Sequence, residues 1–283
     1  MLYKVIKNIE YKYKKLVNTL VLLINNLIRL FYKNNNSELK KIIKENRHTL
    51  SKSSSFLTSA QYKENNYGIP GHIFRSLDKP INEFPTYSDM FIFFSKYLKK
   101  PVNYLEIGVS VLKNFVQINE SLETSSLTGF DINPIAKNSN YIFEEKNKKS
   151  NTLSYFQGDV LSKKDTILFR EKYKEKFNFV FSDALHEHDA VMSEYENIIK
   201  GNLDDEFILY FDDLDFPGLE KTVNFIYSDL KKEYDKLFFT TFYINGWVGQ
   251  HEKLHKNGLV STIDFYKVLK KEKIKLPFLR KWD

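Results

Sequence analysis

The chain has 283 residues, of which 42% are hydrophobic and 28% charged, so it is long enough for one large α/β domain with an additional segment. It contains no cysteine, which excludes disulfides, thiolate metal sites and cysteine nucleophiles. The net charge of +7 belongs to the N-terminus, because residues 1–50 hold 11 Lys and Arg against 3 Asp and Glu. A nucleic-acid enzyme more usually carries its basic surface on the folded domain, so we expect no nucleic-acid partner.

Residues 16–32 have leucines at helical spacing on one side and polar residues opposite, which predicts an amphipathic helix. The stretch is shorter than the roughly 20 apolar residues that a membrane span needs, and no small-residue cleavage site of a signal peptide follows it. Several lysines precede the stretch, a pattern typical of a helix lying on an anionic membrane. Docking on the protein's own domain, or self-association through residues 1–33, is the alternative. We expect a helical arm and linker over residues 1–60 and a cytoplasmic protein, with peripheral membrane contact and docking or self-association left as alternatives for the helix.

Residues 61–100 are predicted to form an irregular covering segment and then a lead-in helix, since Thr86 and Asp89 have capping-box spacing. Residues 101–283 form the main domain, where apolar strands alternate with polar or amphipathic segments. The predicted strands are 102–107, 127–132, 152–157, 177–182 and 206–211, with a further pair at 237–244 and 260–268. This alternation predicts an α/β fold, a Rossmann-like doubly wound, mostly parallel sheet with helices on both faces.

Each of the first five strands ends in polar residues. They are Glu106, Gly108 and Ser110 after the first strand, Asp131 after the second, Gly158 and Asp159 after the third, Asp183 and His186 after the fourth, and Asp212 and Asp213 after the fifth. The carboxyl ends of parallel strands meet at one edge of a sheet, where this architecture binds its ligands. A lone carboxylate there is often only a helix cap, but five consecutive polar strand ends indicate a site.

Over residues 86–268 this order resembles the class I S-adenosylmethionine-dependent methyltransferases. The resemblance implies that Glu106, Gly108 and Ser110 belong to the turn that approaches the methionine part of the cofactor. It also implies that Asp131 binds the ribose hydroxyls and that Gly158 and Asp159 lie near the adenine. A carboxylate can accept both vicinal hydroxyl hydrogens, and a glycine lets backbone approach a ligand. The turn departs from the family's pattern at Ser110 and Leu112, where further glycines are common.

The second half of the domain resembles the metal-dependent O-methyltransferases of the catechol and macrocin types. There an aspartate after the fourth strand and an Asp-Asp or Asp-Asn pair after the fifth hold Mg²⁺. The resemblance implies that Asp183, Asp212 and Asp213 bind Mg²⁺ or another divalent cation, whose preferred ligands are carboxylate oxygens. It implies catalytic roles for Asp183 and for His186, which stands where the catechol enzymes carry a basic residue and can act as general base. The expected acceptor is a small molecule or glycan with a sugar hydroxyl.

The stretch GQHEKLHKNG contains His251, Glu252 and His255 in the H-E-x-x-H spacing of zinc peptidases. That site needs a helix through residues 247–258 and a third ligand, and Ser261 stands where the extended motif has its third histidine. We interpret the match as accidental and expect these three residues on the acceptor side, where they hydrogen-bond a polyhydroxylated substrate or cap a turn.

Two other functions compete with O-methyl transfer. Asp213-x-Asp215 has the D-x-D form with which metal-dependent glycosyltransferases bind a nucleotide sugar, but that function leaves Asp131 and the Glu106–Gly108 turn unexplained. The chain could also be a non-catalytic, methyltransferase-like interaction protein that docks through its N-terminal helix. That function would not require the catalytic residues, whereas Asp183, His186, Asp212 and Asp213 are all present.

Overall fold

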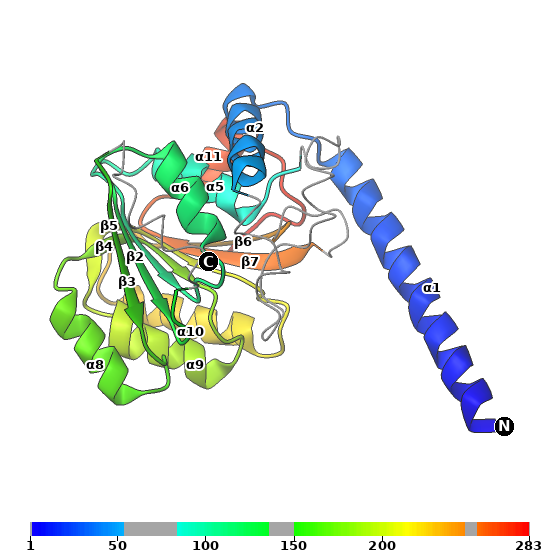
Figure 1. Ribbon diagram of the computed structural model, residues 1–283. Coiled ribbons are helices and arrows are strands. Elements are labelled where there is room, and N and C mark those ends of the chain that lie inside the picture. Colours follow the sequence, from blue (N-terminus) through cyan, green and yellow to red (C-terminus); the bar gives the residue numbers. More distant parts are fainter. Residues whose placement is uncertain (1, 54–83, 136–149, 247–253, 283) are drawn as a thin grey trace.

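The computed structural model describes residues 2–53, 84–135, 150–246 and 254–282. The described residues form one eight-stranded sheet with the strand order β3-β2-β1-β4-β5-β7-β6-β8 (Figure 1). β1 to β5 pair in parallel, whereas β7 is antiparallel to β5 and β6, and β8 is antiparallel to β6. The strands are β1 Asn103–Ile107, β2 Ser126–Asp131, β3 Thr152–Gln157, β4 Phe177–Ser182, β5 Leu203–Phe211, β6 Phe238–Ile244, β7 His255–Ser261 and β8 Arg280–Trp282.

Helices cover both faces of the sheet and enclose two hydrophobic clusters. On one face lie α2 Ser37–Lys52, α5 Tyr87–Ser95, α6 Lys113–Ser121 and α11 Phe265–Lys271 (Figure 1). On the other face lie α8 Lys163–Lys172, α9 His188–Glu194 with its π-helical continuation Tyr195–Ile199, and α10 Leu219–Leu230. The predicted doubly wound, mostly parallel α/β fold is confirmed.

The central strands are buried on both sides because helices cover both faces. β4 is buried at every residue, so the polar Asn178 and Ser182 of its sequence, FNFVFS, are buried as well as its phenylalanines. Thr86 and Asp89 form the predicted capping box at the start of α5.

The first five strands and β6 lie close to their predicted positions, but the prediction of a strand at 260–268 is wrong. β7 is already complete at Ser261, and residues 265–271 form α11 instead. Asp264 caps this helix by accepting a hydrogen bond from the backbone N–H of Lys267 (3.1 Å). The apolar residues Phe265 and Leu269, four apart, are both buried, as expected for a helix face.

α2 belongs to the body of the molecule. The predicted arm of residues 1–60 therefore does not extend over α2. The apolar face of α2 packs in the same hydrophobic cluster as α5 and α6. Arg47 of α2 forms an ion pair with Asp89 at the start of α5 (2.8 Å), and both side chains are buried. Asn46 Nδ2, also on α2, donates a further hydrogen bond to Asp89 (2.7 Å). The sequence suggested an arm because α2 is rich in lysine, but its lysines lie on the exposed face.

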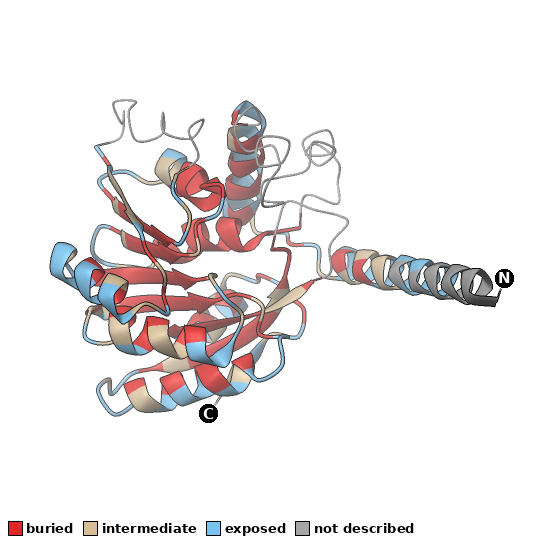
Figure 2. Cartoon of the chain, turned by 60° about the horizontal axis from the view of Figure 1, so that its bottom comes forward, coloured by how far each residue is buried: buried red, intermediate tan, exposed pale blue. Residues whose placement is uncertain are grey.

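α1, Leu2–Phe31, is a long helix whose N-terminal part extends beyond the body (Figures 1 and 2). It is held at its C-terminal end, where the Arg29 guanidinium donates to Asn245 Oδ1 from Nη2 (2.8 Å) and Nε (3.2 Å). Asn34, just after the helix, accepts from the backbone N–H of Lys275 (2.6 Å). None of the helices in the described part of the chain is long and apolar enough to cross a membrane.

Candidate active site

A cavity of about 750 Å³ opens at the carboxyl ends of the parallel strands. It lies where the strand order reverses between β1 and β4, the place where doubly wound sheets bind ligands. Its volume falls in the upper part of the range of small-molecule and cofactor sites. The lining includes residues that follow β1, β2, β3, β4 and β5, together with part of α1. The prediction that the polar strand ends lie together at one edge of the sheet is therefore confirmed.

Gly108 directly follows β1 at this edge and has to be glycine. Its φ is +89°, in the region that side chains disfavour. A Cβ at this position would also overlap the backbone carbonyl group of Asp183, which follows β4. The two strand ends are held together because the backbone N–H of Asp183 donates to Ile107 O (2.8 Å). The turn after β1 is thus tightly packed against the turn after β4.

Asp131 ends β2, lines the cavity and joins two turns. Its Oδ2 accepts from the backbone N–H groups of Val109 (2.8 Å) and Ser110 (2.9 Å), in the turn after β1. Its Oδ1 accepts from the backbone N–H of Asn133 (2.8 Å), in its own turn. A carboxylate has about four lone-pair positions, and three are occupied by these backbone donors. Asp131 therefore shapes the cavity wall in addition to any ligand contact that it makes.

The other residues predicted to bind cofactor separate into two groups. Ser110, Gly158 and Asp159 line the cavity with Gly108 and Asp131. Glu106 does not, because its side chain is buried beneath the edge and accepts hydrogen bonds from Asn114 Nδ2 (2.7 Å) and Tyr104 Oη (3.0 Å). Burial raises the pKa of Glu106 to about 8. Its predicted cofactor contact stays a prediction, and its observed contacts brace β1 against α6.

Asp183, Asp212 and Asp213 come together on the far side of the cavity, with His186 among them. His186 Nε2 lies 3.3 Å from Asp183 Oδ1, and its Nδ1 lies 3.5 Å from Asp213 Oδ2. Asp213 adopts a φ of +51°, an uncommon value for a residue other than glycine, and this strained backbone lies within the acidic cluster. The carboxylates of two neighbouring strand ends thus surround one imidazole.

His255 completes this group from β7, which pairs with β5. Its Nδ1 hydrogen-bonds Asp213 Oδ1, so Asp213 lies between two imidazoles. Because His255 is the first residue of a strand, the helix that a zinc-peptidase motif requires does not run through it. Of the predicted acceptor-side residues, His255 lines the cavity, whereas His251 and Glu252 lie outside the described residues.

The pKa values in this group follow from burial and from crowding of negative charge. Burial, reinforced by the charges of Asp183 and Asp213, raises the pKa of Asp212 to about 8. Burial alone would lower the pKa of His186, but its hydrogen bond to Asp183 and the surrounding carboxylates raise it to about 9. The pKa of Asp213 is lowered although burial opposes this, because His255 donates to it and both imidazoles stabilise its charge.

The predicted metal ligands gather at one place, but they do not form a ready cation site. Across the described residues, no group of three or more His, Asp or Glu side chains is arranged to hold a metal ion. Asp213 bonds to His255, and Asp212 Oδ1 accepts from Asn257 Nδ2 and from the backbone N–H of Asp213 (2.8 Å). The donor chemistry nevertheless suits a hard divalent cation, which would relieve the repulsion among the three carboxylates.

Sequence reasoning missed Asn257 of β7 and the residues that α1 contributes to the site. Asn257, two residues after His255 on β7, is fully buried, bonds to Asp212 and accepts from Tyr210 Oη (2.7 Å). Val21 and Asn25 of α1 line the cavity. The period of two along β7 places His255 and Asn257 on one face, but only the pairing with β5 brings them to the aspartates. Asp215 accepts from the backbone N–H of Lys256, and Gly218 precedes α10.

A scan against protein-family models and a search of curated proteins found no match. Among solved structures, the O-methyltransferase TomG from Streptomyces achromogenes is 12% identical, with 84% of this chain and 95% of that chain covered and a TM-score of 0.46. The O-methyltransferase from Bacillus cereus is 10% identical, with coverage of 84% and 96% and a TM-score of 0.47. A putative caffeoyl-CoA O-methyltransferase from Staphylococcus aureus is 14% identical, with coverage of 76% and 98% and a TM-score of 0.45. These similarities do not assign an activity to this chain.

Proposed function

We propose that this protein is an S-adenosylmethionine-dependent O-methyltransferase. The observation that carries the proposal is one cavity with two chemically different walls. One wall, after β1 to β3, contains Gly108, Asp131 and Asp159, the residues that resemble a cofactor site. The opposite wall, after β4 and β5 and at the start of β7, contains the aspartates and imidazoles, which can bind and deprotonate a hydroxyl. Methyl transfer needs these two functions side by side, so that the hydroxyl oxygen attacks the sulfonium methyl in line.

The proton of the acceptor hydroxyl would pass to Asp183 or His186. At neutral pH the surrounding carboxylates keep His186 largely protonated, because its pKa is raised to about 9. An imidazolium cannot accept a proton, so His186 acts as a base only when its neighbours' negative charge is offset. Asp183 bonds to His186 and is the alternative acceptor, with the pair holding the proton together.

Divalent-metal dependence is part of the proposal. Asp183, Asp212 and Asp213 would hold the cation, and Mg²⁺ is favoured because the donors are carboxylate oxygens. When bound, the ion would lower the pKa of an acceptor hydroxyl and offset the negative charge round His186. We expect EDTA to abolish methyl transfer and Mg²⁺ to restore it, whereas binding of S-adenosylhomocysteine should survive EDTA. Full activity after exhaustive chelation would remove the metal from the proposal and leave methyl transfer in place.

For the acceptor we propose the hydroxyl of a sugar or glycan, on the residues' resemblance to macrocin-type enzymes. His255 supports a polar acceptor because it lies on the wall opposite the predicted cofactor residues. A metal-dependent glycosyltransferase is less well supported, since Asp215 of its D-x-D motif is bonded to the β7 backbone and is not among the lining residues. A non-catalytic protein would have no reason to keep Asp213 between two imidazoles.

Titration calorimetry separates these functions. We expect S-adenosylhomocysteine to bind with one-to-one stoichiometry and UDP-sugars not to bind. The reverse result would favour the glycosyltransferase. If neither ligand binds to folded protein, the non-catalytic function would be supported and the methyltransferase proposal would fail.

A further inference from the structure

α1 exposes its apolar side and buries its polar side, the reverse of a helix that packs on its own domain. Asn25 and Arg29 are only 8% and 4% exposed and face the body. The opposite side, here called the leucine face, has side chains that are 50–78% exposed. The leucine face consists of Leu16, Leu20, Leu23, Leu27, Leu30 and Phe31. Docking on the protein's own domain, one of the alternatives from the sequence, therefore does not explain these leucines.

The leucine face is continuous. At about 100° of rotation per residue, its six residues fall within an arc of roughly 100°, and at about 1.5 Å per residue they extend over roughly 22 Å. A contiguous apolar strip of this size marks an interaction surface, whereas single exposed leucines are common on soluble proteins.

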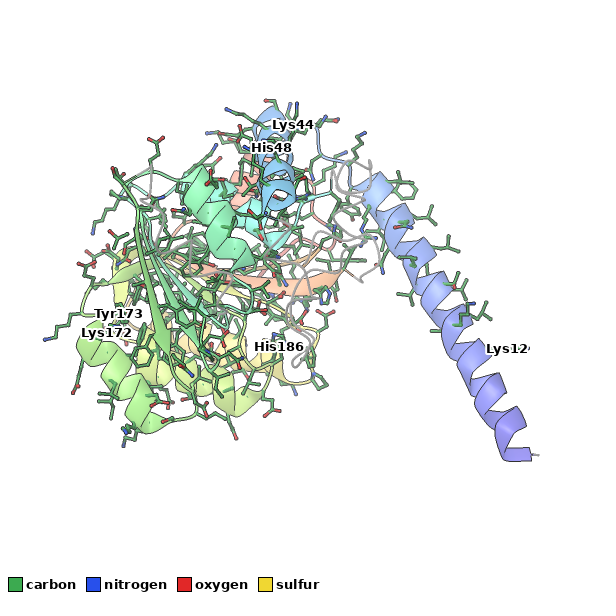
Figure 3. The ribbon with its side chains drawn as sticks, in the orientation of Figure 1. Lys12, Lys44, His48, Lys172, Tyr173 and His186 are labelled. Carbon is green, nitrogen blue, oxygen red and sulfur yellow. The ribbon has the colours of Figure 1, made fainter. Side chains whose placement is uncertain are left out.

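Charge indicates which kind of surface the leucine face contacts. Lys12 and Lys15 are exposed on the part of α1 that precedes the leucines, and Lys12 lies on the extending part of the helix (Figure 3). Residues 1–31, which include all of α1, hold six Lys and Arg against one Glu, a net charge of +5. A second copy of the chain would bring the same positive segment and repel it, whereas an anionic bilayer attracts it. Basic residues beside a wide apolar face are the features of helices that lie in a membrane interface.

The same helix forms part of the candidate active site. Val21, Leu22 and Asn25 line the cavity, and Leu20, Leu23 and Leu27 of the leucine face are their neighbours along the chain. One turn of α1 therefore has the cavity on one side and the exposed apolar strip on the other. A membrane or partner protein that binds the leucine face would therefore also lie next to the cavity.

We propose that the leucine face lies in the surface of an anionic lipid bilayer, and that the methyl acceptor is an amphiphile drawn from that surface. Its hydroxyl-bearing head would enter the cavity past Val21 and Leu22, while its apolar part stays with the lipid. The acceptor part of this inference rests on the proposed methyltransferase function, whereas the membrane part does not.

Co-sedimentation of the full chain with vesicles tests the membrane part. Vesicles of phosphatidylcholine with phosphatidylglycerol should bind the protein, pure phosphatidylcholine should bind it less, and added salt should weaken binding. The double variant Leu20→Gln/Leu27→Gln should lower the partition coefficient at least about tenfold. The matched control is Ile167→Gln/Leu168→Gln, which removes two exposed apolar side chains from α8 and should bind as the native chain does. Binding equal in both double variants would overturn the proposal.

A second copy is the competing occupant, and sedimentation velocity distinguishes it. A native dimer that becomes monomeric in Leu20→Gln/Leu27→Gln, without vesicle binding, would contradict the proposal. A native protein that is monomeric and does not bind anionic vesicles would contradict it equally.

Transfer of radiolabelled methyl from S-adenosylmethionine tests the acceptor part. With a total cell extract as acceptor source, label should enter the chloroform-soluble fraction, and the leucine-face variant should transfer less while binding S-adenosylhomocysteine normally. Label confined to water-soluble products, or absent from lipid while cofactor still binds, would overturn the amphiphilic acceptor. If the native chain does not bind S-adenosylhomocysteine, the proposed function is wrong, and vesicle binding stands as a separate result.

Discussion

Replacing Asp131 by Asn should weaken the cofactor site through the protein's own backbone. Oδ2 of Asp131 accepts from the N–H groups of Val109 and Ser110, and Oδ1 accepts from the N–H of Asn133. An asparagine has one acceptor oxygen, so its NH₂ group must face either the first two donors or the third. At least one charge-assisted hydrogen bond is lost, each worth about 1.5–3 kcal/mol. We expect unfolding to become easier by about that amount.

Affinity for S-adenosylhomocysteine should fall about 10- to 100-fold in Asp131→Asn, because the variant disturbs the turn beside Gly108 and removes a hydroxyl acceptor. Denaturant unfolding and calorimetry measure the two effects. Asp264→Asn is the matched control, since Asp264 also accepts from a backbone N–H but caps α11 and is not among the lining residues. It should lose stability and keep its affinity. If Asp131→Asn bound S-adenosylhomocysteine as tightly as the native chain, the cofactor assignment would be refuted.

Three further predictions concern other parts of the molecule. Arg47→Met should lower the free energy of unfolding by about 3–5 kcal/mol in chemical denaturation, because it leaves the buried Asp89 charge without its partner; a loss below about 1 kcal/mol would mean that α2 is a loosely attached arm. Burial raises the pKa of Glu194 from its ordinary 4.5 to about 8. The contribution of this group to the free energy of unfolding is therefore complete below about pH 4.5 and is lost as the pH rises through 8. The fall in melting temperature from pH 5 to pH 9 should therefore be smaller in Glu194→Gln, and an identical fall would exclude this group. His186→Ala should reduce kcat by about 10²- to 10⁴-fold with cofactor affinity unchanged, and the control His188→Ala, whose imidazole bonds to Thr222 on α10, should keep native turnover.

The parallel part of the fold could be predicted from the sequence because its signals are local. Buried strands contain short apolar runs, such as FILYF at the end of β5, and each is followed by polar residues at the same edge. The secondary structure near the C-terminus was harder to predict, because the apolar residues of 260–268 have spacings that suit either a strand or a short helix. Only the pairing of β7 between β5 and β6 decides that the strand is already complete at Ser261.

The candidate site could be predicted where its residues follow a strand, as with Gly108, Asp131 and Asp183. Asn257 and the cavity residues of α1 could not, because their place depends on packing between segments distant in sequence. α1 is the clearest example. Its amphipathic pattern was visible, but which side faces the body is decided by Arg29 bonding to Asn245, more than 200 residues away. Glu106 shows the opposite case, in which a strand-end carboxylate lies beneath the site and not in it.

A crystal structure of the protein with S-adenosylhomocysteine tests the central claim most directly. The account predicts that the ligand fills the cavity at the carboxyl ends of β1 to β3, with its sugar beside Asp131 and its sulfur facing Asp183 and His186. S-adenosylhomocysteine bound away from Gly108 and Asp131, or density for it nowhere in crystals soaked to saturation, would contradict the account.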